Sequence, residues 1–230
     1  ELGSTIFLFL VLEIAMRSIE QAQWITPQPS LTVVLALAML TGWLLCKSRL
    51  PSRVSYPIAV VLGVLVTIWQ ASNLLPSSET ASRLNQLVVA LHSWWQAVSM
   101  GEPSEGTIHF AAFLIFFTWI ISYVSTWFIL RRQNAWVAIS LGAITILVNL
   151  SNLPKGYYIF FFFYLLAAMF LIGQTNLTRY YYWFREYDIK YRKRGVMYFT
   201  ASLLCFAILA VSVAWLTPEI RVNPVETLVG

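Results

Sequence analysis

The chain has 230 residues, of which 59% are hydrophobic and 11% are charged, and its net charge is +5. Soluble globular domains average about 25% charged and about 45–50% apolar residues, so this composition excludes that class. A helix needs about 20 apolar residues to cross a bilayer, which leaves room for about six to eight crossings. The two cysteines, Cys46 and Cys205, lie in different apolar runs and give no indication of a disulfide or a cysteine metal site.

Seven apolar runs alternate with loops that contain most of the charged residues. Because these runs can form membrane-spanning helices, we expect an all-α fold, a polytopic transmembrane helical bundle. The runs form one membrane domain, residues 1–216, and the extracytoplasmic tail, 217–230, is expected to begin a linker to a further domain. The predicted spans are residues 2–19, 31–46, 58–75, 109–130, 135–150, 157–173 and 196–216.

The first predicted span contains two ionisable residues, Glu13 and Arg17. They are four residues apart, so they share one helix face and are able to pair. Arg17 is near the end of the run, where its long side chain can reach the interface, which leaves Glu13 as the residue that is costly to bury. We favour an interhelical or structural role for Glu13 over a proton relay or a substrate contact.

Residues 81–100 have the pattern of an amphipathic helix. Apolar side chains recur at three- and four-residue spacing, and the polar side contains Ser, Gln and one cation, Arg83, instead of a Lys-rich face that binds anionic lipids. We expect an interfacial helix on the outer side that packs on the spans; a lid or a docking surface is the alternative. The following spans are joined by four residues, 131–134, and should form an antiparallel hairpin.

A basic segment with interleaved aromatic residues, 178–195, separates the last two predicted spans. Each cation costs roughly 2.5–3.5 kcal/mol to place in hydrocarbon, and cations beside spans stay in the cytoplasm. With this segment inside, alternate loops hold 11 of the 15 Lys and Arg residues, which predicts a cytoplasmic N-terminus and an extracytoplasmic C-terminus. Binding of nucleic acid or of an anionic headgroup is the less favoured interpretation of the segment. The topology-determining residues are Lys47, Arg49, Arg53, Arg131, Arg132, Arg179, Arg185, Lys190, Arg192, Lys193 and Arg194.

Sequence motifs for catalysis or cofactor binding are missing. There is no nucleotide-binding glycine loop and no Cys or His pair at metal-ligand spacing, so we predict no cofactor and no metal site. His92 and His109 are expected on the outer side, where interfacial hydrogen bonding is favoured over zinc or proton chemistry. Cys46 and Asp188 are expected on the cytoplasmic side and Cys205 within the membrane. A cysteine, a histidine and an aspartate from these different levels are too far apart to form a catalytic set.

Short motifs stand at the ends of several predicted spans: Ala22-Gln23-Trp24-Ile25, Gly42-Trp43-Leu44-Leu45 before Lys47-Ser48-Arg49-Leu50-Pro51, Arg131-Arg132-Gln133-Asn134-Ala135-Trp136, and Asn149-Leu150-Ser151-Asn152-Leu153-Pro154. With the basic segment, this order resembles the N-terminal membrane region of bacterial transglutaminase-like (TgpA-type) membrane proteins over nearly the whole chain. The resemblance implies the bacterial cytoplasmic (inner) membrane and a following extracytoplasmic papain-like domain with a Cys-His-Asp triad. That domain is absent from this sequence, so no catalytic residue of the family is placed here.

The leading prediction is a membrane anchor and scaffold that presents this extracytoplasmic domain. Its partners would be the lipid bilayer and a tethered domain or other proteins on the outer side, with no nucleic acid. A non-catalytic integral subunit of a larger membrane complex is the first alternative. A transporter or proton-linked carrier that uses Glu13 and Arg17 is the second. Any enzymatic activity, of transglutaminase or cysteine-protease type, would lie in the absent domain.

Overall fold

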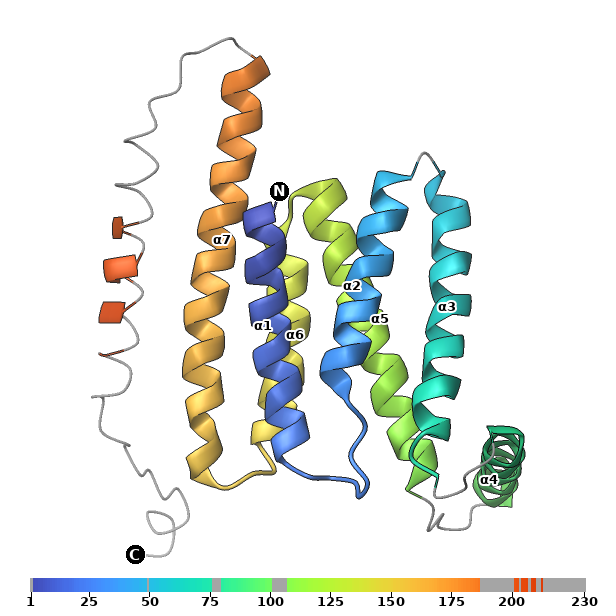
Figure 1. The fold of residues 1–230 in the computed structure, drawn as a ribbon. Coiled ribbons are helices and arrows are strands. Elements are labelled where there is room, and N and C mark those ends of the chain that lie inside the picture. The colour runs from blue at the N-terminus through green and yellow to red at the C-terminus, as the bar shows by residue number, and fades with distance from the viewer. Residues whose placement is uncertain are drawn as a thin grey trace, which may run out of the picture. The chain divides into compact units, whose positions relative to one another are not determined.

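The computed structural model describes residues 2–48, 50–75, 80–100 and 107–186, and eight residues between 201 and 212. The chain divides into two compact units, Glu1–Tyr191 and Arg192–Gly230, and every helix named below belongs to the first unit. The elements assigned within the described ranges are all helical (Figure 1). They are α1 (Leu2–Gln21), α2 (Leu31–Lys47), α3 (Ser52–Ser72), α4 (Thr80–Met100), α5 (Ile108–Arg132), α6 (Ala135–Leu150), the 3-10 helix η1 (Lys155–Tyr158) and α7 (Ile159–Glu186).

Two helices, α1 and α5, join the others into one packed unit. Helix α5 contacts α1, α2, α3, α4 and α6, and helix α1 contacts α2, α5, α6 and α7. The helices other than α4 run side by side, and α4 lies beside the ends of α3 and α5 with its axis roughly perpendicular to theirs (Figure 1). The core between them is apolar, and its fully buried side chains include Leu8, Met16, Leu35, Ile115 and Leu171.

The connections of the first unit gather at two opposite ends (Figure 1). One end holds the start of α1, the α2–α3 and α5–α6 connections and the last turns of α7. The other end, which we call the loop end, holds the α1–α2 loop (22–30), α4 and the turn 151–154. We call the first the cationic end after its residues Lys47, Arg53, Arg131, Arg132 and Arg179.

The expected α5–α6 hairpin is present, and local residues build it. Gln133 ends α5 in the left-handed backbone conformation, with φ 47°, and the next N–H, of Asn134, donates to the Phe128 carbonyl at 3.2 Å. The Asn134 side chain then caps α6, because its oxygen accepts a hydrogen bond from the Trp136 N–H at 2.9 Å. Both bonds satisfy backbone groups that the helix ends would otherwise leave unpaired.

Two helices extend beyond the spans that the sequence predicts for them. Helix α7 does not end at Gly173 but continues to Glu186, so the first part of the basic segment is helical. Polar residues end the stretch that can lie in hydrocarbon, but no proline occurs between Gly173 and Glu186, so nothing in this stretch breaks the helix itself. Helix α3 begins at Ser52 rather than at residue 58, since the N–H of Ser55 already donates to the Pro51 carbonyl at 3.1 Å.

The length and composition of the helices indicate a membrane protein. Within the described residues, the helices long and apolar enough to cross a membrane are Ser52–Ser72, Ile108–Arg132 and Gly156–Tyr180. Helices α2 and α6 are apolar but shorter, and α1 has 20 residues with three charged side chains. Seven spans therefore stay a prediction. The predicted span 196–216 lies mostly, and the tail 217–230 wholly, outside the described residues.

Candidate functional site

The ionisable residues of α1 form a cluster against the start of α2. Arg17 Nε lies 2.7 Å from Glu13 Oε1, and the same carboxylate oxygen accepts a hydrogen bond from Thr32 Oγ1 at 2.9 Å. Glu20 Oε1 accepts from the backbone N–H of Thr32 at 3.1 Å, and Glu20 Oε2 lies 3.8 Å from Arg17 Nη1. The side chain of Glu13 is 16% exposed and that of Arg17 is 55% exposed, so the cation reaches outward from a mostly buried acid.

This cluster stabilises the junction of two helices. The first N–H groups of a helix have no partner within the helix, and the helix dipole makes that end attractive to anions. Glu20 supplies an acceptor to one of these N–H groups of α2, and Glu13 holds the Thr32 side chain beside it. The carboxylates of α1 thus contact α2, and the interhelical role of Glu13 stays a prediction that these contacts support on geometric grounds.

Replacing Glu13 by Gln should lower the melting temperature much less than replacing it by Leu. Gln keeps an oxygen that can accept hydrogen bonds from Thr32 Oγ1 and Arg17 Nε, whereas Leu removes the acceptor for both. Thermal unfolding of the purified protein in detergent, followed by circular dichroism, measures the difference. Equal falls for both variants would show that the charge of Glu13, and not its hydrogen bonds, stabilises the junction.

A second polar network joins α1, α6 and the α1–α2 loop. Asn149 of α6 donates from Nδ2 to Ser18 Oγ of α1 at 2.8 Å, and its Oδ1 accepts from Trp24 Nε1 at 2.8 Å. Ser18 is fully buried and Asn149 is 7% exposed. Asn149 begins one of the helix-end motifs, but its bonds to Ser18 and Trp24 could not be predicted, because a single polar residue at the end of an apolar run carries no periodic signal.

An apolar groove opens beside this network at the loop end. It has a volume of about 400 Å³ and lies between the first turns of α5 and the last turns of α6. Its walls are mainly aromatic and aliphatic. Among its polar residues, Trp24, Asn149 and Asn152 come from the loop, the end of α6 and the turn that follows, and Thr145 comes from within α6. A second apolar pocket of about 340 Å³ lies between α6 and α7.

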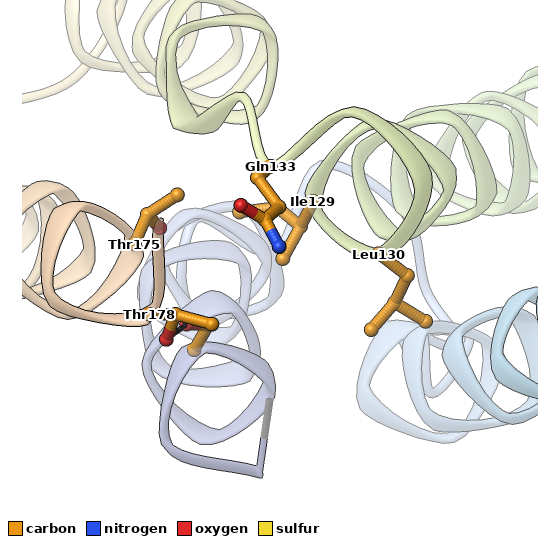
Figure 2. Close-up of a pocket in the computed structure, with 6 residues that line it drawn as sticks. Ile129, Leu130, Gln133, Thr175 and Thr178 are labelled. Carbon is orange, nitrogen blue, oxygen red and sulfur yellow. Dashed lines mark hydrogen bonds between the residues drawn. The ribbon is translucent and has the colours of Figure 1, made fainter. Parts of the chain in front are cut away.

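At the cationic end, the described part of the chain contains a small polar crevice. Figure 2 shows Gln133 facing Thr175 and Thr178 of α7, next to Ile129. Thr178 Oγ1 lies 3.2 Å from Ser4 Oγ of α1. The crevice volume is about 10 Å³, and a water molecule needs about 10–15 Å³ of such space, so at most one water fits. The crevice is a packing feature between α1, α5 and α7.

The structure describes the side chains of some of the predicted topology-determining residues, and the others lie outside its described residues or side chains. Arg131 Nη2 donates to the Leu50 carbonyl at 3.4 Å, and its guanidinium lies 4.4 Å from the Trp127 ring centroid. Lys47 Nζ lies 4.3 Å from the Trp43 ring centroid. Cation–π contacts of this kind hold a cation against an aromatic residue at a membrane interface. Outside the described residues, or described without their side chains, are Arg49, Arg185, Lys190, Arg192, Lys193 and Arg194.

Helix α4 occupies the range expected for the interfacial helix and lies at the loop end (Figure 1). Leu87 is buried, and the Trp94 ring stacks on His109 of α5 with centroids 5.5 Å apart. Val88 is 62% exposed and Trp95 is 65% exposed. Helix α4 therefore packs one apolar edge on the bundle and leaves a second apolar edge open, as expected for a helix at a membrane surface.

The motifs that carry the family resemblance have structural roles here. Gln133 and Asn134 form the α5–α6 turn, and Trp24 bonds to Asn149. Gly42 lets α2 approach α5, because a Cβ atom there would lie 2.9 Å from Thr126 Cγ2. No group of three His, Cys, Asp or Glu side chains that could hold a metal ion occurs among the described residues. The chain matches no family model, no curated protein and no solved structure.

Proposed function

We propose that this unit is a membrane anchor and scaffold that holds other protein segments at the loop end. One observation carries the proposal: the buried polar side chains of this unit form hydrogen bonds between its helices. Glu13 and Glu20 bind α2, Asn149 binds α1 and the α1–α2 loop, and Trp119 of α5 donates to the Ala59 carbonyl of α3 at 3.0 Å. Such groups rigidify a bundle when they are satisfied.

We infer that the presented segment is a transglutaminase-like domain on the extracytoplasmic side. Two sequence features support this inference: the resemblance of the helix-end motifs to that family, and the cation distribution, which predicts an outward C-terminus. The same distribution assigns the cationic end to the cytoplasm and the loop end, with α4, to the extracytoplasmic side.

A non-catalytic subunit of a larger membrane complex is the second candidate. The open apolar edge of α4, with Val88 and Trp95, favours it, because exposed aromatic and aliphatic residues on a helix suit a contact surface. A carrier has less support. Its substrate would need a polar path. Among the described residues, the crevice beside Gln133 admits at most one water, a pocket of about 80 Å³ beside Lys47 is confined to the cationic end, and the two larger pockets are apolar. Glu13→Gln should therefore leave any solute flux in vesicles unchanged.

The intact mass of the native protein, isolated from its membrane without a tag, tests the proposal. A mass well above 26.3 kDa would show a continuing chain and support a tethered domain. A mass close to this value together with a stoichiometric copurifying protein would support the complex subunit. A chain of this mass that purifies alone, from membranes treated with a crosslinker, would overturn the scaffold proposal.

A further inference from the structure

The groove at the loop end has the construction of a ligand site. Small-molecule sites are concave, have volumes of about 300–1,000 Å³ and combine apolar walls with a few polar groups. Here the volume is about 400 Å³, and the aromatic wall includes Phe113 and Phe117, whose rings stack with centroids 5.6 Å apart. The opposite wall includes Ile144 and Val148 of α6.

The groove extends along the helices for most of the depth of one membrane leaflet. Its lining on α6 runs from Ile144 to the turn residue Asn152. With a rise of about 1.5 Å per residue, the helical part of that lining, 144–150, extends about 9 Å along the helix axis. One leaflet contributes about half of a hydrocarbon core that is about 30 Å thick, so its acyl chains extend about 15 Å.

One polar residue, Thr145, lines the deeper part of the groove, and its hydroxyl donates to the Leu141 carbonyl of its own helix; the other polar groups lie at the end that would lie at the interface. Trp24, Asn149 and Asn152 form that end, while its deeper part is lined by Phe117 and Ile144. Among the described residues that line the groove there is no Lys or Arg. The Trp24 N–H is already donated to Asn149, so the indole offers a ring face at the mouth, beside the two amides. An apolar slot with this mouth matches an amphiphile that has a hydrocarbon chain and a polar head.

We propose that this groove binds one acyl chain of a membrane phospholipid, with the head beside Trp24 and Asn152. The groove walls are exposed on α5, a helix long enough to span, and on α6, so in a membrane they face lipid. In a membrane, the molecules that contact such a lipid-facing groove are the acyl chains of the surrounding lipids. This inference concerns a ligand of the bundle itself and does not depend on which domain the scaffold presents.

Photolabelling of the full chain in vesicles tests this site. The vesicles contain phosphatidylethanolamine, phosphatidylglycerol and a phosphatidylcholine with a diazirine near the end of one acyl chain, and mass spectrometry maps the labelled residues. Val148→Trp should fill the groove, and Val61→Trp on α3 is the matched control, because the two valines are 62% and 58% exposed. Ile144→Phe fills the groove from a second position and covers the case in which Val148→Trp does not fold.

We expect Phe113 and Phe117 to be labelled several-fold more than the exposed residues of α3. Groove filling should reduce that labelling several-fold, and Val61→Trp should leave it unchanged. Equal labelling of the groove and α3 in the wild-type protein would show ordinary contact with bulk lipid and overturn the proposal. Labelling that survives in a folded groove-filling variant would also overturn it.

Discussion

Replacing Gly63 by Ala should lower the free energy of unfolding by about 2 kcal/mol. A Cβ atom at Gly63 would lie 2.5 Å from Cδ1 and 2.6 Å from Nε1 of Trp119, which is 2% exposed. The indole cannot move aside without losing the 3.0 Å hydrogen bond from its Nε1 to the Ala59 carbonyl. Ala favours the helix over Gly by about 1 kcal/mol, but overpacking costs about 1–3 kcal/mol and a lost buried partner about 1–3 kcal/mol more.

Denaturation in detergent by added dodecyl sulfate measures this loss, and Gly156→Ala is its control. A Cβ atom at Gly156 would meet nothing within 4 Å, so the control should unfold like the wild-type protein. In a Trp119→Leu background, Gly63→Ala should lower the free energy of unfolding by less, because the smaller Leu side chain can move away from the new Cβ atom. The same cost in both backgrounds would contradict a clash with the indole.

The positions of the helices could be predicted from the sequence because hydrophobicity and local turn chemistry act over short distances. Helix α6 has the predicted bounds, 135–150, since Asn134 caps its start and its apolar run ends where the helix ends. The end of α7 does not coincide with the end of the predicted span, because the helix continues after its apolar part, through residues that favour neither a stop nor a loop. A hydropathy boundary thus marks the edge of the hydrocarbon rather than the end of a helix.

Partners that are distant in the sequence could not be predicted in this way. The spacing of Glu13 and Arg17 indicates their pairing, but nothing local indicates that Thr32 shares the same oxygen. Asn149 is 125 residues from Trp24 in the sequence, and their hydrogen bond depends on how α1 and α6 pack. The groove also results from helix packing. In the sequence, its aromatic wall on α5 cannot be told apart from any other apolar helix face.

Replacing Asn149 by Ala should also lower the free energy of unfolding by about 2 kcal/mol. The substitution removes the donor to buried Ser18 and the acceptor for Trp24. Hydrogen bonds between membrane helices contribute about 0.6 kcal/mol on average and up to about 1.7 kcal/mol, and Asn149 makes two. Asn152→Ala is the matched control, because Asn152 is exposed and donates to atoms of its own turn, the Val148 carbonyl and Ser151 Oγ.

Hydrogen exchange separates the two bonds of Asn149. Loss of the bond to Trp24 should release the α1–α2 loop, so amides of residues 22–30 should exchange faster in Asn149→Ala than in Asn152→Ala. Loss of the bond to Ser18 acts on the contact between α1 and α6, and prior replacement of Ser18 by Ala should reduce the cost of Asn149→Ala. If Asn149→Ala and Asn152→Ala cost the same, the network does not hold the loop. If they differ as expected, an asparagine at the end of α6 positions both the α1–α2 loop and the mouth of the groove.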